Sequence, residues 1–137
     1  MIQLIVGNEG TGKTAKLLDK VNEEIKEAKG SFVYLDKNQK HMFELNNKVR
    51  LIDVSQFDFD TVDEFYGFVC GIISQDYDIE KIYFDNFLKI GNIIDLYDAL
   101  KKFQALGDKY NIDMTFSIAK DQSNIPADFK SAIIVAL

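Results

Sequence analysis

The sequence has few of the residues that build disulfides, zinc sites or histidine-based catalytic sites. It contains one cysteine, Cys70, and one histidine, His41. A single cysteine excludes an intrachain disulfide, so folding does not depend on an oxidising compartment. We expect Cys70, which lies in an apolar stretch, to be buried. Two soft ligands cannot assemble a zinc site, and the absence of a nucleophile motif disfavours Ser-His-Asp or Cys-His catalysis.

Proline and long apolar runs are also scarce. One proline and eight scattered glycines leave no linker-like segment, so we expect residues 1–137 to form a single domain. No apolar run approaches the roughly 20 residues that cross a membrane. The chain opens on an apolar segment without a basic leader. We therefore expect a cytoplasmic protein without membrane insertion.

Positive charge is outweighed by negative charge, and arginine is represented by Arg50 alone. The formal net charge at pH 7 is −6. Long-range repulsion from phosphate backbones follows, which disfavours non-specific nucleic-acid binding.

Segments with strand-like and helical patterns alternate along the chain. Short apolar runs predict strands over residues 2–6, 32–35, 79–84, 114–119 and 131–137. Helical spacing predicts helices over residues 14–29, 62–73 and 93–106, the last of them capped by Asn92. This alternation predicts an α/β fold, a three-layer α/β/α sandwich with a mainly parallel sheet. Ligands of such folds bind at the carboxyl ends of the strands.

The region between residues 37 and 54 does not fit this alternation. Two short apolar segments, 41–45 and 48–54, are separated by Asn46-Asn47. Asparagine tolerates the positive φ of a tight turn, so we predict a small hairpin. A helical turn over residues 39–45 is the alternative.

The first expected strand and helix are joined by Gly7-Asn8-Glu9-Gly10-Thr11-Gly12-Lys13-Thr14. This is the phosphate-binding pattern of Gly, four residues and Gly-Lys-Thr. Glycines let the backbone turn tightly and approach a phosphate, and successive N–H groups then form an anion-binding concavity. We expect Lys13 to contact the β- and γ-phosphates and the Thr14 hydroxyl to bind Mg²⁺. Residues 7–14 therefore predict a binding site for a nucleoside triphosphate.

A second segment with the same implication is Ile82-Tyr83-Phe84-Asp85, an apolar strand that ends in a carboxylate. Together the two segments resemble the Walker A and Walker B elements of the P-loop NTPase superfamily, in the branch of RecA-like and AAA-like ATPases. The strand expected at 114–119 falls where that branch has an extra strand. The chain is also similar to short bacterial ATP-binding proteins. The resemblance implies a P-loop NTPase fold, Asp85 as a ligand of Mg²⁺, and ATP, because no Asn-Lys-x-Asp element is present to select guanine.

The resemblance is incomplete at the residue expected to activate water. Relatives usually place Glu directly after the Walker B Asp, and this chain has Asn86. An amide can hold a water but cannot take its proton. Some RecA-like relatives carry the catalytic carboxylate at the end of the second strand, where Asp36 lies. Glu9, inside the phosphate-binding segment, is the other candidate base.

Cations near the expected phosphates are also few. Lys120, and after it Ser117, fall where relatives keep a phosphate-sensing polar residue. Arg50 is the only candidate for an arginine finger, in a segment whose position the sequence does not fix.

These features favour a protein that binds Mg²⁺ and ATP, hydrolyses slowly, and acts as a switch through residues 37–48. One alternative is an interaction module on a degenerate phosphate loop, which Asn86 favours and the intact Lys13-Thr14 pair opposes. Another is a small nucleoside or nucleotide kinase, which the shortage of arginine opposes. A protein partner or a homo-oligomer is the expected source of any missing catalytic group.

Overall fold

The computed structural model describes residues 1–137. The strands are β1 (Ile2–Val6), β2 (Ser31–Asp36), β3 (Val49–Asp53), β4 (Ile79–Phe84), β5 (Asp113–Ile118) and β6 (Ile133–Ala136). The α-helices are α1 (Lys13–Glu24), α2 (Val62–Ser74), α3 (Phe87–Ile90) and α4 (Leu96–Tyr110). Short 3-10 turns, η1 (Ile25–Glu27), η2 (Val54–Gln56), η3 (Gln122–Asn124) and η4 (Ala127–Ala132), complete the chain.

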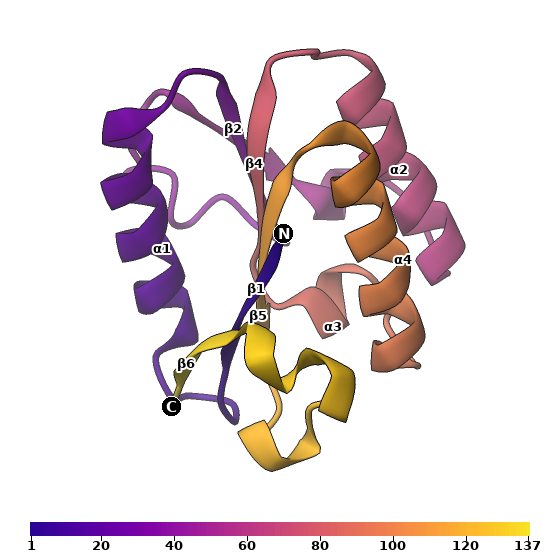
Figure 1. The fold of residues 1–137 in the computed structure, drawn as a ribbon. Coiled ribbons are helices and arrows are strands. Elements are labelled where there is room, and N and C mark those ends of the chain that lie inside the picture. Colours follow the sequence, from indigo (N-terminus) through magenta and orange to yellow (C-terminus); the bar gives the residue numbers. More distant parts are fainter.

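The six strands form one sheet in the order β3-β2-β4-β5-β1-β6. Every neighbouring pair is parallel. Helix α1 covers one face of the sheet, and α2, α3 and α4 lie on the other (Figure 1). The predicted three-layer α/β/α architecture is therefore confirmed. Because all strands run in the same direction, the segments that follow their carboxyl ends meet along one edge.

Two apolar cores separate the layers. On the α1 face, Leu17 and Val21 pack with the strand aromatics Phe32, Tyr34 and Tyr83. The opposite face is rich in phenylalanine, in a cluster of Phe65, Phe84, Phe87, Phe103 and Phe116. Such rings each bury a large apolar area, so this face supplies much of the hydrophobic stabilisation.

Local capping sets where the two long helices begin. Thr61 caps α2, since its hydroxyl accepts the N–H of Glu64 at 3.2 Å. The prediction that Asn92 caps the following helix was wrong, because Asp95 takes that role and accepts the N–H of Asp98 at 3.1 Å. Asn92 instead has a φ of 52°, and its side-chain amide donates to the Phe59 carbonyl.

The predicted hairpin between residues 41 and 54 was also wrong. Strand β3 pairs parallel to β2, so residues 37–48 form a crossover of consecutive turns, closer to the helical-turn alternative. Leu45 is buried in the α1-side core. Asn22 of α1 fixes the neighbouring backbone, donating to the Glu44 carbonyl and accepting the N–H of Asn46. A turn does form at Asn46-Asn47, where the Val49 N–H donates to the Asn46 carbonyl at 3.0 Å, but it leads into a strand parallel to β2 and not into a hairpin.

Helix length and composition also bear on membranes. None of the helices is both long enough and apolar enough to span a bilayer.

Candidate functional site

The segment from Gly7 to Thr14 joins β1 to α1 at the carboxyl edge of the sheet. Gly10 and Gly12 have φ values of 78° and 93°, a region that favours glycine. Gly7 is required for space, since an added Cβ would lie 2.6 Å from the Thr11 hydroxyl oxygen. The Thr11 hydroxyl in turn donates to the Asn8 carbonyl at 2.7 Å. Each fixed glycine of the motif thus has its own steric or conformational reason.

Lys13 is the first residue of α1 and is only 8% exposed. Its ammonium donates to the Asn8 carbonyl at 2.9 Å, which folds the lysine back over the loop. No side chain caps the start of α1, and its first turn contains no acidic residue. The N–H groups of this turn and the positive end of the helix dipole therefore favour an anion at the loop.

Asp85 follows β4 and is the centre of a buried hydroxyl network. The Thr14 hydroxyl donates to Asp85 Oδ1 at 3.1 Å, and the Ser117 hydroxyl donates to the same oxygen at 3.1 Å. The Tyr34 hydroxyl donates to Oδ2 at 2.8 Å. Asp85 is 4% exposed and forms no ion pair with a lysine or arginine. Neutral hydroxyl groups from α1, β2 and β5 thus hold a buried carboxylate whose charge no side-chain cation neutralises.

The donor atoms of this network fit magnesium. A carboxylate and a hydroxyl are hard oxygen ligands, and Mg²⁺ is typically bound by one or two carboxylates together with phosphate oxygens and waters. Thr14 and Asp85 supply such a pair, 3.1 Å apart. The chain has no cluster of three or more His, Cys, Asp or Glu residues that would hold a metal without a ligand.

Asp36, at the end of β2, lies beside Asp85. The backbone N–H of Asp85 donates to the Leu35 carbonyl, which joins the two strand ends. Asp36 is 5% exposed and accepts the N–H of Lys37 at 2.7 Å. Burial raises the pKa of Asp36, and the negative charge of Asp85 raises it further. The two carboxylates predicted from strand ends thus share one environment.

A polar cavity of about 170 Å³ opens above these residues. It is lined by Glu9, Gly10, Gly12, Lys13, Thr14, Asp85, Asn86, Ser117 and Ala119. Lys13 is the only cation among them. Asn86 has a φ of 59°, and its N–H donates to the Ser117 hydroxyl at 2.7 Å. The cavity therefore brings together most of the residues that the sequence marked.

Several predicted residues do not line this cavity, among them Gly7, Asn8 and Thr11 of the loop. Asp36 is buried close by but does not line it, and neither does Lys120, which follows the lining residue Ala119. Arg50 pairs with Asp76, which follows the end of α2, at 3.9 Å. Since Arg50 lies in β3 at the edge of the sheet, no arginine of this chain reaches the cavity.

Tyr34 is the site residue that the sequence analysis missed. It is fully buried, and burial, followed by the charge of Asp85, raises its pKa, so the phenol stays protonated and donates. In the sequence, the only indication was that Tyr34 carries a hydroxyl and lies two positions before Asp36. Identifying its partner required knowing that β2 lies beside β4.

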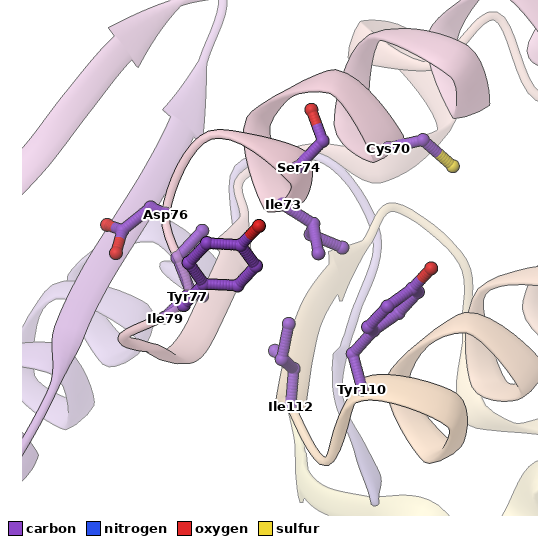
Figure 2. A pocket seen from close by; sticks show the side chains of 8 residues that line it. All are labelled: Cys70, Ile73, Ser74, Asp76, Tyr77, Ile79, Tyr110 and Ile112. Carbon is purple, nitrogen blue, oxygen red and sulfur yellow. The ribbon is translucent and has the colours of Figure 1, made fainter.

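A larger pocket, of about 310 Å³, lies near the amino ends of β4 and β5 (Figure 2). Its lining is mainly apolar, formed by Cys70, Ile73, Ser74, Asp76, Tyr77, Ile79, Tyr110 and Ile112. Cys70 is partly exposed there, so the prediction of a buried thiol was wrong. This pocket contains no lysine or arginine and lies at the opposite edge from Gly7–Thr14, so its chemistry does not suit a polyphosphate.

Comparison with known proteins supports the architecture. No protein-family model matches the chain, and no curated protein matches it. Among solved structures it is similar to the flagellar accessory protein FlaH from Methanocaldococcus jannaschii, with a TM-score of 0.58 and 12% sequence identity. The similarity covers 93% of this chain and 63% of the FlaH chain, so this chain spans less than two thirds of FlaH. At that identity the likeness shows the fold alone, an α/β structure with an all-parallel sheet.

Proposed function

We propose that this chain binds a nucleoside triphosphate together with Mg²⁺, and that the nucleotide is ATP. The phosphates would lie on the Gly7–Thr14 loop, and Thr14 and Asp85 would hold the metal. The resemblance of the sequence to P-loop NTPases supports this proposal.

One observation carries the proposal. The Thr14 hydroxyl and the Asp85 carboxylate, 71 positions apart in sequence, lie 3.1 Å from each other at the uncapped start of α1. Apolar packing does not require these polar groups to meet, and a buried carboxylate without a cationic partner is costly. A bound Mg²⁺ would supply the missing positive charge and contact the phosphates at the same time.

Slow hydrolysis follows from the residues around the cavity. Asn86 lines the cavity, but its amide cannot accept a proton from water. Asp36 can accept one, and its raised pKa moves it toward the range of a general base. No arginine is near, and an arginine finger is worth about 10³–10⁵ in rate. A protein partner or a second copy of the chain would be the source of fast turnover.

The test is calorimetric titration of Mg-ATP, Mg-ADP and Mg-GTP into wild type, Lys13→Ala and Lys16→Ala, with phosphate release assayed in the same samples. Lys16 is exposed on the same helix and provides a matched loss of charge. We expect Lys13→Ala to weaken Mg-ATP binding by about ten- to a hundredfold, the value of a hydrogen bond to a charged group. Lys16→Ala should bind like wild type.

The results also separate the alternatives. Failure of a folded wild type to bind any nucleotide would refute the proposal and favour an interaction module on this fold. Equal losses in Lys13→Ala and Lys16→Ala would show a general charge effect in place of a phosphate site. A preference for Mg-GTP would leave the phosphate site intact and correct the choice of base.

A further inference from the structure

Two lysines outside the phosphate-binding motif lie at neighbouring strand ends. Lys37 directly follows β2, and Lys89 belongs to α3, the short helix that follows β4 and Asp85. The hydrogen bond from the Asp85 N–H to the Leu35 carbonyl, at 2.9 Å, holds these strand ends together. Both lysines are exposed at the carboxyl edge of the sheet, the edge that carries the cavity.

Lys37 and Lys89 start from neighbouring elements and have no ion-pair partner. The side chain of Lys89 lowers the pKa of Lys37, in keeping with the neighbouring positions of the elements that carry them. Neither lysine forms an ion pair in the structure, although other lysines of the chain do. Asp36 and Glu9 are the carboxylates near enough to act on Lys37. Two unpaired cations on neighbouring elements favour an anion that can contact both.

The charge of the cavity indicates which anion this would be. Asp85, Asp36 and Glu9 place carboxylates in or beside it, and Lys13 is its only lining cation. A bound triphosphate adds several further negative charges, and these gather at the terminal phosphate during phosphoryl transfer. Arg50 lies elsewhere, on the β3 edge. Further cations at this edge of the sheet would therefore bind the terminal phosphate, where the negative charge is greatest.

We propose that Lys37 and Lys89 together bind the terminal phosphate of the nucleotide and make this site distinguish triphosphates from diphosphates. This inference rests on the proposed function. Lysines are suited to the role because each presents a compact charge on a flexible stem, and the two stems start from adjacent elements. The pair would take the place of the arginine that the cavity lacks.

The experiment compares Mg-ATP and Mg-ADP affinities by calorimetry in wild type and in the double variant Lys37→Gln/Lys89→Gln. The control is Lys29→Gln/Lys40→Gln, which removes the same charge at two exposed lysines. We expect the test variant to lose about tenfold or more in Mg-ATP affinity while its Mg-ADP affinity stays within about twofold. The control should keep both affinities.

Each outcome bears on a different claim. Equal losses for Mg-ATP and Mg-ADP, or wild-type affinity for both in the test variant, would overturn the lysine pair and leave the proposed function standing. An equal loss in the control would assign the effect to net charge and overturn the pair as well. If wild type binds neither nucleotide, both the proposed function and this inference fail. All four side chains are exposed, so circular dichroism should show unchanged folding.

Discussion

Replacing Tyr34 with phenylalanine tests the hydroxyl network around Asp85. The phenol hydroxyl donates to Asp85 Oδ2 at 2.8 Å, and the ring is fully buried beside Tyr83, with centroids 6.5 Å apart. Phenylalanine keeps the ring and removes only the donor. The variant therefore isolates one hydrogen bond to a buried carboxylate.

The size of the effect follows from the groups that remain. A hydrogen bond to a charged group contributes about 1.5–3 kcal/mol. Asp85 Oδ1 keeps its bonds from Thr14 and Ser117, and no cation is present to compensate at Oδ2. We expect Tyr34→Phe to lower the free energy of unfolding at pH 7 by about 2 kcal/mol. For a chain of this size, that corresponds to a Tm lower by roughly 5 to 10 °C.

A matched control exists on the neighbouring strand. Tyr83 is equally buried and donates to Glu24 Oε1 at 2.6 Å, a carboxylate that also pairs with Lys20 and Lys81. Neither Tyr83 nor Glu24 lines the polar cavity. Urea denaturation and Mg²⁺-dependent ATP binding should be measured for wild type, Tyr34→Phe and Tyr83→Phe. Both variants should lose stability.

Only Tyr34→Phe should change the Mg²⁺ dependence of ATP binding. Groups that orient a metal ligand typically contribute 10- to 100-fold in metal affinity, so we expect a shift of about tenfold or more. A Tyr34→Phe variant as stable as wild type would refute the argument that this hydrogen bond is needed. An equal Mg²⁺ shift in both variants would show that the tyrosines act through general packing.

Two further predictions concern stability alone. Burial raises the pKa values of Tyr34 and Tyr83. Above the ordinary tyrosine pKa of about 10, these phenols therefore ionise in the unfolded chain and stay protonated in the folded one. Each of the two tyrosines then lowers the free energy of unfolding by about 1.4 kcal/mol per pH unit. Urea denaturation between pH 10 and pH 12 should show a shallower loss in Tyr34→Phe/Tyr83→Phe, and an unchanged slope would contradict this. Gly67 and Gly71 are exposed inside α2 and an added Cβ meets no atom within 4 Å, so Gly67→Ala and Gly71→Ala should each stabilise the fold by about 0.5–1 kcal/mol. A lower urea midpoint in either would contradict this.

The fold could be predicted because its signals are local and repeated. Short apolar runs alternating with helical periodicity lead directly to a parallel α/β sheet. The errors arose where two local signals competed or where packing decided. A turn forms at Asn46-Asn47 as its composition suggested, but burial of Leu45 against α1 makes it the end of a crossover to a parallel strand and not the turn of a hairpin. Asn92 and Asp95 are both good caps, but Asn92 has a φ of 52°, outside the extended region of an N-cap residue, and α4 begins after Asp95.

The part of the site that is contiguous in sequence could be predicted, and the part assembled from separate strands could not. Gly7–Thr14 can be recognised from spacing alone, and Asp85 from its position after an apolar strand. Tyr34 and Ser117 reach Asp85 only because β2 and β5 are the neighbours of β4 in the sheet. Strand order is not encoded in local periodicity, so these contacts could not be assigned from the sequence.

Each residue that could activate a water for hydrolysis lacks one property of a general base. Asn86 has access but is an amide, and Asp36 is a carboxylate with a raised pKa that does not line the cavity. Glu9 has both properties, but it is exposed and makes no side-chain hydrogen bond that would position a water. If the chain binds the proposed triphosphate, these deficiencies favour its retention over rapid turnover. If Lys37 binds the terminal phosphate, the contact is made by the first residue of the 37–48 crossover. Loss of that phosphate would then change the conformation of this crossover first, the segment that Asn22 hydrogen-bonds to α1.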